Sequence, residues 1–232
     1  MPIVRIINIL FPLLAVLSGF YAFKVLDKKL RIVLILVSIG FCTESLLWVA
    51  VEMGSKNTLP GLHFYVMVEF LFWSLFYLYQ LEGFIKKNYL LYIIVVFEII
   101  CAINTIFVQD LTEFPQTRAI EGLIIIFFSI LTFYRIMVEE SIEKLILSPV
   151  IWINTVVLIY FAGNLFFYTV FSSLLIQNYE VLKFINIYVF SSLNVIFYSG
   201  IAVGFLIHKF NLSRQFNIND KKKKGERTID AF

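Results

Sequence analysis

Seven long apolar runs constrain this chain more than any motif does. They cover residues 5–23, 32–53, 61–81, 90–108, 117–137, 150–176 and 186–207. Each is near or above the ~20 residues that an α-helix needs to cross ~30 Å of hydrocarbon. The runs lack the alternating period of barrel strands, so we expect helices. The sequence therefore predicts an all-α integral membrane protein with seven transmembrane helices.

Composition excludes the soluble class. Hydrophobic residues make up 60% of the 232 residues and charged residues only 15%, and the mean hydropathy is +0.89. A soluble domain would need a polar surface that this composition cannot supply. We expect the first run to be a retained helix rather than a signal peptide, because it is aromatic near its end and a basic loop follows it directly.

Lysine and arginine gather on one side of the predicted membrane. Of the 19 such residues, only Arg5, Lys56, Arg118 and Lys183 lie on one side, and the other 15 lie on the opposite side. Positive residues concentrate in cytoplasmic loops. We therefore predict a multi-pass protein of the cytoplasmic (inner) membrane, with its N-terminus outside, its C-terminus in the cytoplasm and the lipid bilayer as a partner.

The connections between the runs are short and leave no room for a second folded domain. The predicted organisation is a seven-helix transmembrane bundle over 1–210 and a cytoplasmic tail over 211–232. The tail is polar and contains four consecutive lysines, so we expect it to be disordered and attracted to anionic lipid.

Acidic residues inside the apolar runs are the candidates for function, because unpaired charge in hydrocarbon is costly. Glu44, Glu69 and Glu98 lie within the second, third and fourth runs, at middle to outer depth. We expect them to face one shared cavity that opens outward. Three carboxylates with few cations nearby cannot all stay ionised in a dry bundle, so at least one should be protonated.

Other polar residues share faces of the predicted helices with these acids. The candidate ligand- or proton-binding set is completed by His63, Tyr65, Asn104, Asn164, Tyr168, Asn194 and Tyr198. Arg118 and Glu121 are three residues apart and form a candidate outer ion pair. The alternative is that each acid simply bonds across a helix interface and holds the bundle together.

Several chemistries are excluded or weakened. No lysine lies inside a run, so a retinal Schiff base is excluded. The histidines are His63 and His208, at opposite faces, and we predict no metal site and no cofactor. Cys42 and Cys101 lie at membrane depth and are expected to be packing residues. No motif indicates nucleic-acid binding or a particular reaction, so an enzyme is the weaker class.

The sixth and seventh runs resemble a known family. The segments SPVIWINT at 148–155 and YFAGNLF at 160–166, with Asn194 inside the seventh run, are similar to small uncharacterised bacterial seven-helix membrane proteins. That family is often encoded beside sensor histidine kinases. The resemblance implies a membrane-embedded receptor that passes a state to a separate cytoplasmic histidine kinase.

The leading hypothesis is a sensory or signalling membrane protein that binds a small ligand or protons in a polar pocket inside the bundle. A small-solute or proton-coupled transporter is the alternative. Pro115 and Gln116 precede the fifth run as in some sugar carriers, but the first run lacks the matching proline–glutamine pair. An intramembrane enzyme or a scaffold is the third class.

Overall fold

The structure is a computed structural model that describes residues 2–55, 57–139, 147–177 and 179–229. The described chain is built from helices, with no strand among the described residues. In chain order these are α1 (Pro2–Ala22), α2 (Lys28–Glu52), α3 (Leu59–Gln80), α4 (Lys87–Ile103), the π-helix η1 (Asn104–Val108), α5 (Thr117–Glu139), α6 (Pro149–Gln177), α7 (Tyr179–Phe184), the π-helix η3 (Ile185–Val189) and α8 (Phe190–Ile229). The predicted all-helical fold is confirmed.

Six of the described helical stretches are long and apolar enough to cross a membrane. They are Ile6–Val25, Lys28–Glu52, Leu59–Gln80, Lys87–Val108, Thr117–Glu139 and Ile187–Ser213. The sixth predicted run corresponds to α6, of which Pro149–Leu165 counts as a shorter apolar helix. The chain therefore has the build of a multi-pass membrane protein.

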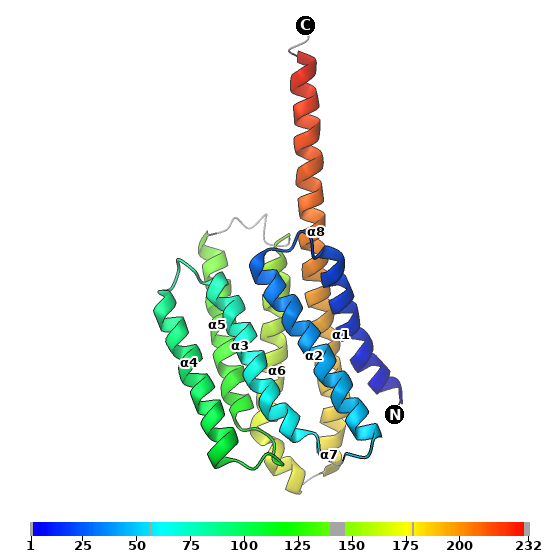
Figure 1. Cartoon of the computed structure of the whole chain (residues 1–232), viewed down its shortest axis with the longest axis vertical. Coiled ribbons are helices and arrows are strands. Elements are labelled where there is room, and N and C mark those ends of the chain that lie inside the picture. Colours follow the sequence, from blue (N-terminus) through cyan, green and yellow to red (C-terminus); the bar gives the residue numbers. More distant parts are fainter. Residues whose placement is uncertain (1, 56, 140–146, 178, 230–232) are drawn as a thin grey trace.

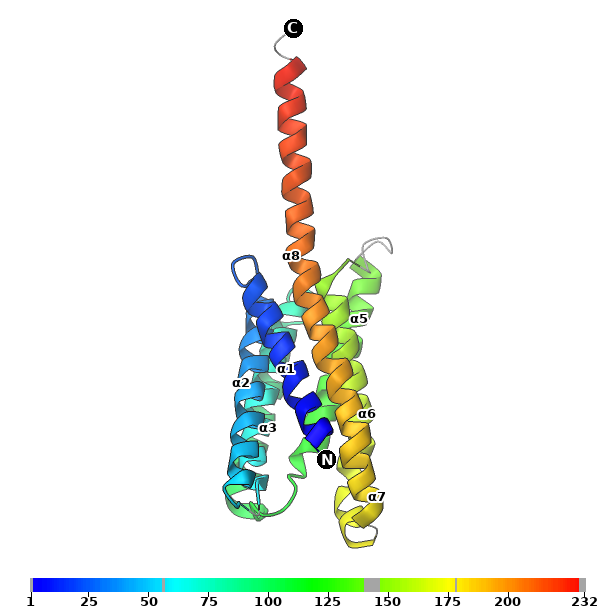
Figure 2. The ribbon, with the colours of Figure 1, turned by 90° about the vertical axis from the view of Figure 1, so that its right-hand side faces the viewer.

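The helices run up and down in one bundle (Figure 1). α8 packs against α1 and α6, α5 against α6, and α2 against α1 and α3. α4 lies at the edge of the bundle and packs mainly on α3. Figure 2 shows α2 and α3 on one side, α6 and α8 on the other, and α1 leaning between them.

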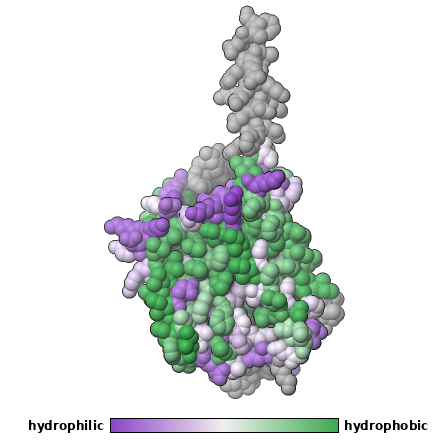
Figure 3. All heavy atoms as spheres, in the orientation of Figure 1, coloured by the Kyte–Doolittle hydropathy of each residue, from purple (hydrophilic) through white to green (hydrophobic). Residues whose placement is uncertain are grey.

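Apolar side chains cover the face of the bundle seen in Figure 3, and hydrophilic residues gather at its two ends. Tyr92, Phe127 and Leu17 are more than half exposed although they lie in the middle of helices. Exposed apolar area on this scale marks contact with lipid or another apolar partner. The strongly hydrophilic end is the one where α8 leaves the bundle, and we call it the basic end, after Lys28, Lys29 and Lys87.

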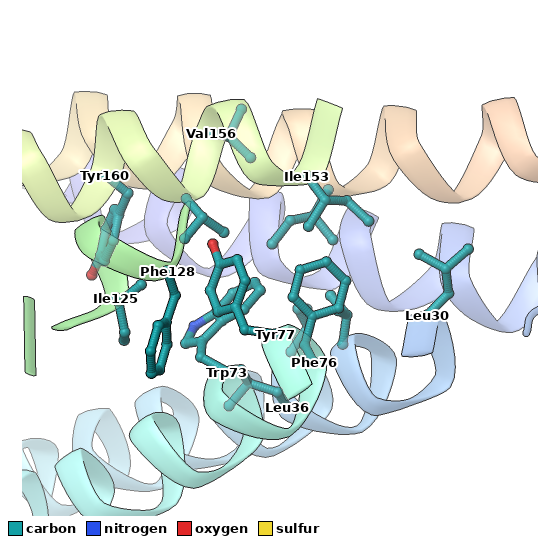
Figure 4. Close-up of a cluster of buried hydrophobic side chains, with 14 of the residues drawn as sticks. Leu30, Leu36, Trp73, Phe76, Tyr77, Ile125, Phe128, Ile153, Val156 and Tyr160 are labelled. Carbon is teal, nitrogen blue, oxygen red and sulfur yellow. The ribbon is translucent and has the colours of Figure 1, made fainter. Parts of the chain in front are cut away.

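An aromatic layer fills the middle of the bundle (Figure 4). Trp73, Phe76 and Tyr77 of α3 are fully buried, and the Tyr77 ring contacts the Phe128 ring of α5. The Trp73 and Phe76 rings pack edge to face with centroids 5.7 Å apart, a favoured geometry for aromatic pairs. Side chains of Ile153 and Val156 from α6 complete the layer.

One buried asparagine ties three helices together within this layer. Asn154 of α6 accepts a hydrogen bond from the Tyr77 hydroxyl of α3 at 2.9 Å. Its Nδ2 donates to the Ser129 carbonyl of α5 at 3.0 Å, and the Ser129 hydroxyl donates back to the Asn154 carbonyl at 3.3 Å. Both the oxygen and the nitrogen of this side-chain amide therefore have a hydrogen-bond partner inside an apolar core.

We predict that Asn154→Leu lowers the free energy of unfolding by about 1–2 kcal/mol, because the Tyr77 hydroxyl and the Ser129 carbonyl lose their partner. Chemical denaturation in bicelles measures the change. Ser192→Ala is the control, since Ser192 is exposed and donates to the Tyr188 carbonyl one turn earlier in η3, and it should change stability by less than about 0.5 kcal/mol. An equal loss in both variants would contradict the prediction.

α8 differs from the sequence-based expectation of a disordered tail after residue 210. It continues as one helix to Ile229 and projects well beyond the bundle (Figure 1). Residues 211–229 contain no proline, and their four lysines and two arginines are residues that form helices readily. They also extend a helix that is already formed, so no new nucleation is needed.

Candidate functional site

A cavity of about 190 Å³ lies between α2, α3, α5, α6 and α8, in the half of the bundle farther from the basic end. Each of these helices supplies at least one polar lining residue. The lining comprises Gly40, Thr43, Glu44, Leu47, Leu62, Tyr65, Glu69, Arg118, Tyr160, Phe190, Asn194, Phe197 and Tyr198. The far half of the bundle therefore contains a polar space walled by charged and aromatic side chains.

A buried charge cluster forms the floor of this cavity. The Arg118 guanidinium of α5 donates to the carboxylate of Glu69 on α3 and, from the same nitrogen, to Glu121 at 3.1 Å. Glu69 is 3% exposed, Arg118 5% and Glu121 0%. One cation is thus shared by two buried carboxylates, and removing it would leave both without compensation.

Glu44 of α2 lines the same cavity without a partner. Among the described residues no hydrogen bond or ion pair reaches its carboxylate. Gly40, one turn earlier on the same face, lets two phenols approach α2. A Cβ at Gly40 would lie 2.9 Å from the Tyr65 hydroxyl oxygen and 3.5 Å from that of Tyr198.

Aromatic rings make the remaining wall. The Tyr160 and Phe197 ring centroids are 4.4 Å apart, and those of Phe197 and Tyr198 are 5.1 Å apart. The Arg118 guanidinium carbon lies 5.9 Å from the centre of the Tyr65 ring. Trp73 of the aromatic layer stacks edge to face on Phe197 at 6.0 Å, so the cavity wall continues into the core.

The chain matches no known protein family, no curated protein and no solved structure. What the site can do has to follow from its own residues.

Five of the predicted ligand- or proton-binding residues line this one cavity: Glu44, Glu69, Tyr65, Asn194 and Tyr198. Arg118, predicted to pair with Glu121, lines it as well, and its guanidinium lies 3.1 Å from the Glu121 carboxylate. The cluster around Arg118 is buried and includes Glu69 of α3 as a second acid. The spacing of Arg118 and Glu121 along one helix could not reveal an acid from another helix.

Glu98 does not line the cavity, in contrast to the expectation that all three glutamates share it. It is half-buried on α4, with one carboxylate oxygen buried and lacking a hydrogen bond. The reason is the position of α4 at the edge of the bundle, where α3 and α5 stand between it and the cavity.

Three further candidates take part in local structure rather than in the cavity lining. His63 is buried, and its Nε2 bonds the Glu113 carbonyl at 3.0 Å. Asn104 donates to Gln109 at 3.0 Å, and Asn164 donates to the Tyr160 carbonyl of its own helix at 2.8 Å. The side chain of Tyr168, also predicted, lies outside the described part of the structure.

The loop between α4 and α5 is ordered by Gln109, which the sequence did not single out. Its Nε2 donates to the Phe114 carbonyl at 2.7 Å, and its Oε1 accepts from the Gln116 backbone N–H at 3.1 Å. In the same loop, hydrogen bonds from the backbone N–H and hydroxyl of Thr112 hold the pKa of Asp110 below its usual value.

Sequence reasoning missed Gly40, Thr43 and Phe197 as cavity residues. Gly40, Thr43, Glu44 and Leu47 recur at spacings of three and four, so they share a face of α2. That spacing was available as a signal around Glu44. Tyr160 shares a polar face of the sixth run with Asn164 by the same spacing, and it lines the cavity. Phe197 could not be found in this way, because aromatic residues fill every run.

A second cavity of about 280 Å³ lies at the basic end. Gln80 connects its two cations, since Lys29 donates to the Gln80 side chain at 3.3 Å and Arg135 donates to its carbonyl. On α3, Gln80 is eleven residues beyond Glu69, or about 16 Å along the axis. The aromatic layer of Trp73 and Tyr77 lies between the two cavities.

Within the described residues, no group of three or more histidine, cysteine, aspartate or glutamate side chains could hold a metal ion. Cys42 is exposed and Cys101 is buried, and both are free thiols.

Proposed function

We propose that this chain is a seven-span membrane receptor, with its N-terminus outside and its basic end in the cytoplasm. α6 is 29 residues long, enough for a seventh crossing in addition to the six other apolar stretches. The lysine-rich turns between α1 and α2 and between α3 and α4 lie at the same end as the α8 projection. Under the positive-inside rule this end is cytoplasmic, and the 190 Å³ cavity then lies in the outer half.

The observation that carries the receptor proposal is the continuity of α8. Residues 190–198 of this helix supply Phe190, Asn194, Phe197 and Tyr198 to the cavity. The same helix runs without a break to Ile229, beyond the opposite end of the bundle. A ligand that favours one position of the α8 wall over another therefore shifts the cytoplasmic segment too, because a helix transmits displacement along its axis.

A cytoplasmic histidine kinase is the partner that we propose for this segment. Its support is the resemblance of the sixth and seventh runs to proteins encoded beside such kinases. Purification from native membranes in mild detergent tests it: a kinase present in stoichiometric amount supports the proposal, and a chain purified alone under several detergents contradicts it.

A transporter is the second candidate, and one observation favours it. Two cavities at opposite ends of the bundle, separated by the aromatic layer, are also what a carrier with alternating access would have. In a receptor this layer stays closed, whereas in a carrier it must open towards each side in turn.

We predict that Glu44→Gln shifts the cytoplasmic part of α8. Spin labels at Glu82 and Ser213, in protein whose two native cysteines are replaced by serine, report the distance between the α3–α4 turn and α8. Replacing the partnerless carboxyl group by an amide that cannot ionise should change this distance by about 1–5 Å, the range of helix shifts in switching proteins. Glu180→Gln, an exposed acid on α7, is the matched control and should change nothing.

Liposomes that contain the purified protein alone separate the two candidates. A receptor leaves proton and solute gradients across the liposome intact. Sustained flux that depends on Glu44, with an unchanged label distance, would overturn the receptor proposal in favour of the transporter.

A further inference from the structure

We infer that the ligand of the outer cavity is a small organic cation, with an ammonium group as the part recognised. This inference rests on the proposed function, because it names the ligand class of the same cavity. It is carried by the charge balance of the site, by the aromatic wall and by two polar groups that lack a partner.

The acids at the cavity outnumber the cations that reach them. Glu44, Glu69 and Glu121 supply three carboxyl groups, and Arg118 is the one guanidinium that reaches any of them among the described residues. Arg118 is already shared by Glu69 and Glu121. A cationic ligand would compensate an ionised Glu44, whereas an anionic ligand would find only the already shared Arg118 as a counter-charge.

The wall around Glu44 has the chemistry of an ammonium site. Tyr65, Tyr160 and Tyr198 present aromatic rings to the cavity, and ring faces attract ammonium groups most strongly where water is excluded. Tyr198 is only 5% exposed, and its hydroxyl has no hydrogen-bond partner among the described residues. Tyr198 lines the cavity, so a polar group on the bound cation can form a hydrogen bond with this hydroxyl.

The size of the cavity limits the ligand. A water molecule occupies about 30 Å³ in the liquid, so roughly six waters fill the 190 Å³ space. Metabolites with a single ammonium group and fewer than about ten heavy atoms match this volume, whereas most drug-sized ligands need larger pockets. Asn194 and Thr43 supply additional polar groups for a hydroxyl or carbonyl on such a molecule.

Calorimetry on the full chain in nanodiscs tests the inference with a matched pair of probes. Choline carries a quaternary ammonium, and 3,3-dimethylbutan-1-ol has the same shape without the charge. Methylammonium, tetramethylammonium and acetate extend the series. At least one cation should bind about tenfold or more tightly than the neutral isostere and acetate, a difference of about 1.4 kcal/mol.

Variants assign the binding to this cavity. Glu44→Gln should weaken binding of the best cation about tenfold or more, and Tyr198→Phe should weaken it by a smaller factor while leaving the fold intact. Glu180→Gln should leave the affinity unchanged. Trp73 fluorescence reports whether the cavity is occupied, because the Trp73 ring contacts Phe197 of the cavity wall. This measurement uses protein in which Trp48 and Trp152 are replaced by phenylalanine.

The outcomes separate this inference from the proposed function. Preference for acetate or the neutral alcohol, no binding of any cation, or proton uptake alone would overturn the ligand class. The receptor proposal would still stand if the α8 label distance responds to Glu44→Gln. If a cation binds but the α8 label distance does not change, the ligand class is supported and the receptor proposal is overturned.

Discussion

Arg118→Met is expected to lower the free energy of unfolding by about 3–5 kcal/mol, the range found when one partner of a buried ion pair is removed. The variant leaves the carboxylates of Glu69 and Glu121 without their shared cation. Both are almost fully buried, so neither can be rehydrated without opening the bundle. Chemical denaturation in bicelles, followed by far-UV circular dichroism, measures the loss.

Neutralising the two acids provides the rescue for this variant. Glu69→Gln and Glu121→Gln, combined with Arg118→Met, should recover most of the lost stability, because no buried charge remains uncompensated. Glu139→Gln breaks the pair between Arg135 and Glu139, which is partly exposed, and should cost about 1 kcal/mol or less. A similar loss for Arg118→Met and Glu139→Gln would show that the cluster does not hold the bundle.

Gly200→Ala is expected to cost about 1–3 kcal/mol, in the range for added methyl groups in packed cores. A Cβ at Gly200 would lie 2.2 Å from Cγ1 of Val156 on α6. Val156 is β-branched and cannot turn away easily. Gly204, one turn later, meets Ile153 at 2.7 Å and the Pro149 carbonyl oxygen at 3.2 Å. Small residues four apart are what allow two membrane helices to pack this closely.

Two further variants separate crowding from the general effect of losing a glycine. Val156→Ala in the Gly200→Ala background should restore much of the stability by making room. Gly122→Ala on α5 is the control, because its Cβ would meet Leu165 at an ordinary 3.7 Å, and alanine favours a helix over glycine. Destabilisation of both single variants to the same extent would contradict close packing of α6 and α8 at Gly200. The same bicelle denaturation serves for all three.

The spacing of Gly200 and Gly204 can be seen in the sequence, but it does not indicate which helix packs against them. For the acids, likewise, the sequence does not indicate which other helices they face. Periodicity placed Glu69 on a polar helix face, and the structure brings it and Glu44 to one cavity. Glu98 had the same kind of signal and lies elsewhere, because α4 is at the edge of the bundle.

The sequence by itself determined that the chain is helical and where its long apolar helices lie, because burying backbone polar groups in an apolar medium allows few alternatives to helices. It also located the acids along those helices. Only the tertiary structure decided which of them meet, that Arg118 is shared by Glu69 and Glu121, and that α8 forms both the cavity wall and the projection. The physical reason is that helix formation depends on local hydrogen bonds, whereas the rotation and neighbours of each helix depend on side-chain packing between residues far apart in the chain.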